Sequence, residues 1–193
     1  MKIARGFADP ERPAIAALYW EAFGQKLGRT LGPRHKALVF VAKVLNPSHA
    51  ICARGADGAL LGVAGFKTSE GALVGGEFRD LMAVYGLLGA LWRVMLLSLL
   101  ERDSEDRRFL MDGIFVAESA RGQGVGSRLL EAVAQEAALR GYAEVRLDVV
   151  EGNDRARALY ERCGFHAVGT QSMGPLAWIF RFRSATTMVR RIL

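Results

Sequence analysis

Three glycines at alternate positions, Gly122, Gly124 and Gly126, separate an apolar run from a long helical pattern. The apolar run covers residues 109–116 and the helical pattern residues 127–140. Glycine permits backbone conformations and close approaches that a Cβ atom would prevent. Amide groups at a helix start have no intrahelical acceptor and carry partial positive charge, so they favour anions. The junction therefore predicts a strand–turn–helix unit that holds a diphosphate.

The spacing of this turn excludes the two best-known phosphate loops. G-x-G-x-G differs from the G-x-G-x-x-G of dinucleotide-binding folds, and no Gly-Lys-Ser/Thr follows as a P-loop requires. With Arg121 in first place, the string RGQGVG resembles the Q/R-x-x-G-x-G/A signature of the GNAT superfamily of N-acetyltransferases. The resemblance implies that the ligand of the turn is acetyl-coenzyme A.

A second motif supports the same resemblance. The string NDRARALYERCGF at residues 153–165 resembles the superfamily's N-x-x-A-x-x-L-Y-x-x-x-G-F pattern. It follows an apolar run at residues 144–150 that fits the family's fifth strand. The similarity covers about residues 109–170, and the rest of the chain is assigned by order and pattern. It implies an α/β fold in which helices flank both faces of a mixed, mostly antiparallel sheet, with the fourth and fifth strands splayed apart.

Periodicity and breaker residues predict the remaining elements. With 193 residues, 51% of them hydrophobic, the chain can bury a sizeable core, and no linker or repeat divides it, so we expect one domain over residues 1–193. The helix at 127–140 ends at Gly141, and a helix starts at Asn153 and stops at Gly164. The other predicted elements before the two motifs are a strand at 2–7, a helix at 10–23 whose end is loosened by Gly24 and Gly28, a helix at 33–45, and a hairpin of 49–54 with 60–67. After the motifs we expect a strand at 165–173, an insertion at 176–182 and a last strand at 185–192. Alternatively, residues 178–182 form that last strand.

Residues 81–100 form an apolar segment with a single formal charge, Arg93, and its length equals a membrane span. A span here would put strands of one sheet on opposite sides of a bilayer, where they cannot pair, so a membrane partner is not expected. A helix with surplus apolar surface remains, and in the family such elements often border the acceptor site. We expect Trp92 and Met95 to line the acceptor site or the interface of a homodimer; a buried core helix is the alternative.

The resemblance also implies how the coenzyme is held. The family binds phosphate in this loop mainly through backbone amides. Of the two side chains, Arg121 would contact phosphate more readily than Gln123, because its position matches the signature and the ligand is an anion. Main-chain groups of the strand ending at Val116 would pair with pantetheine amides where the two strands splay. Asn153 either reaches the pantetheine or caps its own helix, and Ala156 leaves room for the coenzyme. The expected coenzyme-binding residues are Ile114, Phe115, Val116, Arg121, Gly122, Gln123, Gly124, Val125, Gly126, Ser127, Asn153, Ala156 and Tyr160.

Acetyl transfer to a primary amine needs a base for the ammonium group and an acid for the departing thiolate. Tyr160 matches the family's tyrosine and thereby receives the role of acid. Asp112 stands where many relatives carry glutamate and, by alternation, shares a strand face with Ile114 and Val116, so it is the candidate base, acting through a water. The alternative is that the Asp112 carboxylate is not a base but forms an ion pair with an arginine such as Arg107 or Arg146. Two glutamates before the apolar segment are fallback bases, Glu70 and Glu77.

Other function classes receive less support. Three scattered histidines lack metal-ligand spacing, so no metal is expected. A net charge of +6 attracts anions in general but does not by itself indicate nucleic acid, which is not an expected partner. The first residues lack the layout of a secretory signal, and we expect a cytoplasmic protein. The acceptor, a small molecule or a peptide amine, is not readable from the sequence. A non-catalytic acyl-coenzyme A sensor is the alternative function.

Overall fold

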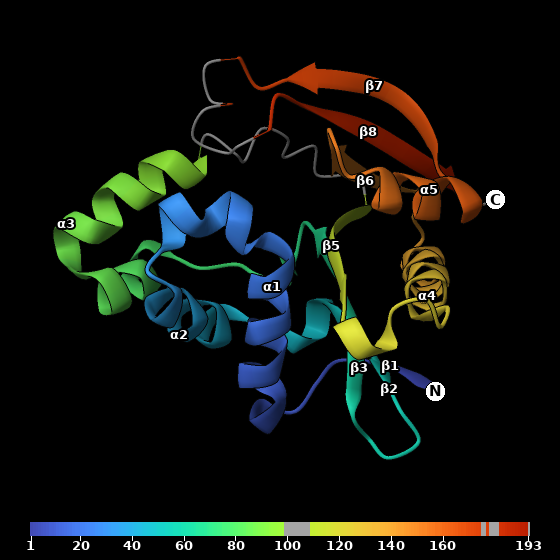
Figure 1. Cartoon of the computed structure of the whole chain (residues 1–193), viewed down its shortest axis with the longest axis horizontal. Helices are drawn as coiled ribbons and strands as arrows, with labels where there is room; N and C mark the ends of the chain where they lie inside the picture. The colour runs from blue at the N-terminus through green and yellow to red at the C-terminus, as the bar shows by residue number, and fades with distance from the viewer. Residues whose placement is uncertain (99–108, 175–176, 178–181, 193) are drawn as a thin grey trace.

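The computed structural model describes residues 1–98, 109–174, 177 and 182–192, and there it has one mixed sheet covered by helices on both faces (Figure 1). The strands are β1 (Lys2–Arg5), β2 (Ala50–Arg54), β3 (Leu60–Thr68), β4 (Gly71–Ala72), β5 (Phe109–Val116), β6 (Glu144–Val150), β7 (His166–Ser172) and β8 (Ser184–Arg191). The helices are α1 (Arg12–Leu31), α2 (Arg34–Val44), α3 (Phe78–Ser98), α4 (Val125–Leu139) and α5 (Asp154–Arg162), with short 3-10 turns η1 (Asp9–Glu11), η2 (Pro47–His49) and η3 (Glu118–Ala120).

The strand order is β1-β2-β3-β5-β6-β8-β7, and β4 pairs with β3. All neighbours are antiparallel except β5 and β6. These two parallel strands pair only at their beginnings, Phe109 with Val145 and Leu110 with Arg146, and then separate. The mixed, mostly antiparallel sheet with a splayed central pair is therefore confirmed.

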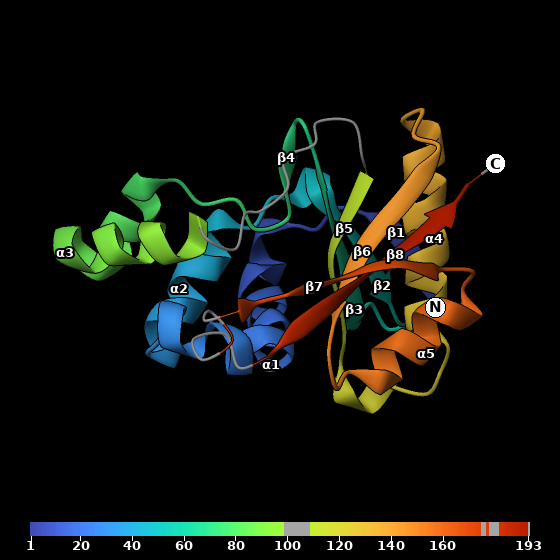
Figure 2. The same cartoon turned by 90° about the horizontal axis from the view of Figure 1, so that it is seen from above.

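Helices lie on both sides of the sheet (Figure 2), and each face has its own hydrophobic core. On one face, α4 and α5 pack on the sheet, and Leu129, Val133 and Ala137 of α4 are buried as their helical spacing predicts. On the other face, α1, α2 and α3 form a separate apolar cluster around Ile15 and Phe40. The opening between β5 and β6 lies between these two layers.

Helix α1 is longer than predicted. It runs to Leu31 through Gly24 and Gly28, where the sequence suggested an end near residue 23. Each glycine costs a helix about 1 kcal/mol relative to alanine, which is less than the stabilisation from burying the last turn. At Gly24 the ring of Trp20 occupies the space of a side chain, since an added Cβ would lie 2.8 Å from it. Packing therefore accounts for Gly24, whereas Gly28 has open space where a side chain would be.

The C-terminal strands agree with the first of the two predicted arrangements. β7 follows the predicted strand at 165–173, and β8 matches the strand predicted at 185–192. Most of the insertion at 176–182, and with it the alternative last strand, lies outside the described residues. Strand β4 and the three short 3-10 turns have no counterpart in the prediction.

Helix α3 carries the apolar segment and is kinked at Gly86, whose φ is 72°. Residues 78–97 are long and apolar enough to cross a membrane, and 17% of the most apolar window is buried. β3 and β5, which precede and follow α3 in the chain, pair directly, so a single crossing between them is not compatible with the sheet. Arg93 joins α3 to the end of α1, because it donates to the Gly32 carbonyl oxygen at 2.9 Å. Within α3, Arg93 also donates to the Gly89 carbonyl at 2.8 Å and stacks on the ring of Tyr85.

Candidate active site

A cavity of about 560 Å³ lies where β5 and β6 diverge. One wall is α1, the opposite wall is α5, and the turn before α4 closes one end. Its lining residues are Leu18, Glu21, Ala22, Phe23 and Lys26 of α1; Met111–Val116 of β5; Ala120, Arg121, Gly122, Gly124, Val125, Gly126 and Ser127 around the turn; Asp148, Val149 and Val150 of β6; and Asn153, Arg155, Ala156, Leu159, Tyr160 and Arg162 around α5. The cavity joins both predicted motifs to a helix that neither motif includes.

Asp112 is the extra residue of a β-bulge in β5. Gly65 pairs with Gly113 and Phe66 with Met111, so Asp112 has no residue opposite it in β3. The bulge breaks the alternation, and the prediction that Asp112 shares a face with the residues at 114 and 116 is wrong. Its exposed carboxylate lines the cavity. Burial and, after it, the charge of Asp112 raise the pKa of Tyr19 in α1, so the carboxylate lies towards that helix.

Beyond Leu110 the edge of β5 that faces β6 pairs with no strand in the described part of the chain. Ile114, Phe115 and Val116 lie in this stretch and line the cavity. Main-chain groups at such an edge can pair with an extended amide-containing chain in the way an added strand does. The edge therefore suits a pantetheine-like group.

Two physical reasons explain why glycine occupies the three positions of the turn. Gly122 and Gly124 have φ values of 78° and 76°, a left-handed conformation that other residues adopt at a cost. At Gly126 the reason is packing, because an added Cβ would lie 2.9 Å from a terminal methyl of Leu159 in α5, which would then have to move. No side-chain group caps the start of α4, and no acceptor among the described residues bonds the amides of Val125, Gly126 and Ser127. These amides and the helix dipole form an anion site at one end of the cavity.

The two side chains of the turn point to different places. The Nε of Arg121 donates to the Val116 carbonyl at 3.3 Å, and Arg121 lines the cavity. The Gln123 side chain donates to the Ser119 carbonyl at 2.8 Å, and Gln123 is not among the lining residues. The geometry thus favours Arg121 over Gln123 as a side-chain contact.

Helix α5 brings Tyr160 to the cavity. Asn153 caps the helix, since its Oδ1 accepts from the Ala156 amide at 3.3 Å. Tyr160 is 7% exposed, and its ring centroid lies 6.0 Å from that of Phe165. Burial raises the pKa of Tyr160 to about 12. Within the described part of the chain its hydroxyl makes no hydrogen bond, although it borders the cavity, so it can donate one to a ligand.

The α1 wall was not anticipated from the sequence. Leu18, Ala22 and Lys26 follow one another at helical spacing and all line the cavity, together with Phe23. The Phe23 ring also packs edge-on against Phe115 of β5, with centroids 6.2 Å apart, which fixes the wall to the sheet. The i, i+4, i+8 spacing was visible in the sequence, but the helix was expected to end near residue 23.

Several candidates lie away from the cavity. Trp92 and Met95 are on the outer part of α3, 37% and 62% exposed, and do not line it. Glu70 pairs with Arg140 at 3.1 Å and Glu77 with Arg79 at 3.0 Å, again outside the cavity. Among the described acidic residues, Asp112, Glu21 and Asp148 line the cavity. Of these, Asp148 accepts a hydrogen bond from the Thr187 hydroxyl at 2.6 Å.

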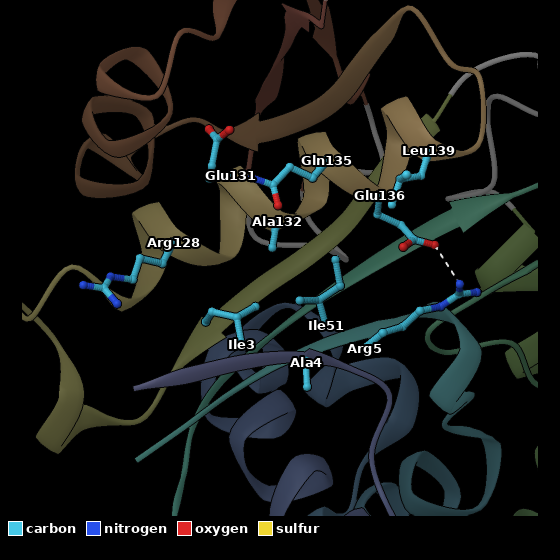
Figure 3. A pocket seen from close by; sticks show the side chains of 10 residues that line it. All are labelled: Ile3, Ala4, Arg5, Ile51, Arg128, Glu131, Ala132, Gln135, Glu136 and Leu139. Atoms are coloured by element: carbon cyan, nitrogen blue, oxygen red, sulfur yellow. Dashed lines mark ion pairs between the residues drawn. The ribbon is translucent and has the colours of Figure 1, made fainter. Parts of the chain in front are cut away.

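A second hollow, of about 400 Å³, lies between β1 and α4 (Figure 3). Three of its four charged side chains form ion pairs with protein groups: Arg5 with Glu136 at 3.1 Å, and Glu131 with Arg190 at 2.8 Å; the fourth is Arg128. The hollow lies outside the splay and has no bordering helix start. In the described ranges no group of three or more His, Cys, Asp or Glu side chains is placed to hold a metal.

Comparison with known proteins gives one family. The model of the acetyltransferase (GNAT) family matches residues 12–165. A bovine (Bos taurus) thialysine N-epsilon-acetyltransferase is 38% identical over 58 residues, 30% of this chain and 34% of that protein, so the match spans about a third of the relative's length. An N-acetyltransferase from Staphylococcus aureus Mu50 superposes with a TM-score of 0.72 at 15% identity, over 98% of this chain and 100% of that one. A Bacillus subtilis acetyltransferase in complex with CoA gives 0.51 at 14% identity, over 75% and 76% of the two chains.

Proposed function

The chain belongs to the acetyltransferase (GNAT) family, and we propose that it is an acyltransferase that transfers an acetyl group from acetyl-coenzyme A to a primary amine. The observation that carries this proposal is the cavity in the splay, because it joins an anion-binding helix start, an unpaired strand edge and two titratable side chains. These features suit, in order, a diphosphate, a pantetheine arm and a reacting thioester.

The donor would lie along β5. Its diphosphate would accept hydrogen bonds from the amides of Val125, Gly126 and Ser127, with Arg121 as an additional cation. Its pantetheine amides would pair with the free edge near Ile114. The Bacillus subtilis fold neighbour, which is in complex with CoA, supports coenzyme A as the carrier.

Asp112 would remove a proton from the acceptor's ammonium group, directly or through one water. A free alkylamine has a pKa of about 10, so the neutral nucleophile is scarce at pH 7 without a base. Exposure of the carboxylate in the cavity keeps it within reach of solvent and acceptor. The amine then attacks the thioester carbonyl, and the tetrahedral intermediate expels the thiolate while its nitrogen loses its second proton to solvent, which returns a proton to the tyrosinate left at Tyr160.

Tyr160 would donate its hydroxyl hydrogen to the departing sulfur. Its raised pKa keeps the phenol protonated at neutral pH, so the donor form is always present. Because no protein acceptor among the described residues competes for this hydrogen, the donation has no internal bond to break. No covalent acyl-enzyme is part of this scheme.

A screen of primary amines for acetyl-coenzyme A-dependent thiol release tests the proposal, with wild type and Tyr160→Phe compared on each acceptor. We expect turnover by the wild type and a marked loss in the variant. Saturable binding of acetyl-coenzyme A without turnover on any amine would support the sensor function and overturn the enzyme function. The carboxylate of Asp112 in the cavity favours catalysis over sensing.

We also propose that the protein acts in the cytoplasm as a homodimer that uses the outer face of α3. Leu87, Leu88, Leu91 and Met95 are 62%, 81%, 62% and 62% exposed, a contiguous apolar strip at helical spacing. Light scattering coupled to size exclusion tests the dimer, with Leu88→Glu expected to shift it to monomer. A wild-type monomer at micromolar concentration would overturn this arrangement.

A further inference from the structure

Lys26 stands at the end of the cavity away from the diphosphate turn. Its Nζ lies 5.7 Å from the Phe23 ring centroid and 5.9 Å from that of Phe182, which precedes β8. The start of β8 pairs with the end of β6, Ala185 opposite Val150. In Figure 1, β7 and β8 lie above the splay, while η3 and the turn that follows it lie at the lower end of β5. The turn that is proposed to bind the diphosphate and the Lys26 ammonium group therefore lie at opposite ends of the cavity.

The ammonium group of Lys26 has aromatic neighbours but, in the ranges that the structure describes, no ionic partner. Among the described residues no carboxylate pairs with it, and partial burial lowers its pKa. Lys43, by contrast, forms an ion pair with Asp80 at 3.3 Å. A cation that is partly removed from water gains most from an anion that arrives with a ligand.

The rest of this wall suits a short aliphatic chain. Leu18, Ala22 and Phe23 are apolar and precede Lys26 on the same helix. Asp112 and Glu21 border the same cavity, so an acceptor there would meet carboxylates at one point and an ammonium group at another. This distribution complements a molecule with an amine and an anionic group joined by an apolar linker.

We propose that the acceptor is an amine that also carries a carboxylate, and that Lys26 is the residue that selects it by pairing with that carboxylate. This inference rests on the proposed acetyl transfer and adds the substrate class. Lys26 acts on binding of the acceptor and not on the transfer itself. The selected molecule is amino-acid-like, with its reacting amine at the Asp112 end.

Matched acceptors that differ only in the anionic group test the inference: 6-aminohexanoate against 6-aminohexanamide, and L-lysine against L-lysinamide. For the wild type we expect kcat/KM for the carboxylate member to exceed that for the amide by about 10- to 100-fold, as for a charge-assisted hydrogen bond. In Lys26→Met the carboxylate member should fall to the level of the amide, mostly through KM. Lys26→Arg, which keeps the charge, should retain part of the preference.

Three results would overturn the inference: equal use of both members by the wild type, an unchanged preference in Lys26→Met, or a raised KM for acetyl-coenzyme A as the variant's main defect. The last result would assign Lys26 to the donor. If no amine is acetylated, the proposed function fails. The inference is then tested separately by calorimetry, which measures the binding of 6-aminohexanoate to protein saturated with coenzyme A. Saturable binding that Lys26→Met abolishes supports the carboxylate site, and absence of binding by the wild type rejects it.

Discussion

Replacing Tyr160 by phenylalanine removes one hydroxyl group and leaves the ring. The ring is 7% exposed and packs near Phe165, and its hydroxyl makes no hydrogen bond to the described residues. No protein bond is lost, so the free energy of unfolding at pH 8 should change by less than about 0.5 kcal/mol. The variant therefore separates catalysis from folding.

The effect on turnover should be much larger. A positioned proton donor contributes about 10²- to 10⁴-fold to a rate, so kcat for thiol release should fall by at least about 100-fold at saturating acceptor. KM for acetyl-coenzyme A should change little, because the hydroxyl would act on the sulfur only as it departs. Thiol release measured across acetyl-coenzyme A concentrations gives both constants. A kcat within about threefold of wild type would refute the role of Tyr160.

The pH dependence of stability gives an independent check on the burial of this hydroxyl. The folded protein holds the pKa at about 12, above the ordinary value of 10. Such a group stabilises the fold fully below pH 10, and the contribution is lost as pH rises towards 12. One pKa unit is about 1.4 kcal/mol, so wild type should lose about 1 kcal/mol more than Tyr160→Phe between pH 8 and pH 11. Urea unfolding at both pH values measures the difference, and equal losses would show that the phenol is not buried in solution.

Three further substitutions test other parts of the account. Asp112→Asn removes the proposed base, so kcat/KM at pH 7 should fall by about 100-fold relative to wild type and recover partly at higher pH, where more of the amine is neutral. A ratio of variant to wild-type kcat/KM that does not change with pH would count against Asp112 as the base. Gly126→Ala places a Cβ 2.9 Å from Leu159 and should cost about 1 kcal/mol of stability and raise KM for acetyl-coenzyme A, as kinetics and urea unfolding would report; an unchanged KM would separate this packing from coenzyme binding. Arg93→Met removes the hydrogen bond that joins α3 to the Gly32 carbonyl at the end of α1, together with one inside α3 to Gly89, and should lower stability by about 2 kcal/mol in the same unfolding assay; no loss would mean that other contacts are sufficient to hold α3.

The sequence predicted most of the sheet and the glycine turn before α4, because local chemistry determines them. Gly122 and Gly124 need a left-handed backbone, and Asn153 caps its own helix. Such constraints act within a few residues of the chain and can therefore be predicted from the amino-acid sequence. The splay of β5 from β6 came only through the family resemblance, since no local pattern specifies which strands separate.

The parts that the sequence missed depend on contacts between distant segments. The length of α1 is decided by packing that outweighs the cost of two glycines, and with it the position of Lys26 in the wall. The bulge at Asp112 is a mismatch between β3 and β5, which a count along one strand cannot reveal. Trp92 and Met95 were assigned by analogy, and the kink at Gly86 and the docking of Arg93 direct them away from the cavity.

Calorimetric titration with donor fragments tests most directly whether the turn before α4 grips a diphosphate. Acetyl-dephospho-coenzyme A keeps the diphosphate, whereas S-acetyl-4′-phosphopantetheine keeps the thioester arm and a single phosphate. We predict one saturable site for the first compound and an affinity at least about tenfold lower for the second, because main-chain donors and the helix dipole lose half of their anionic partner. Equal affinities, or no saturable binding of either compound, would contradict the account.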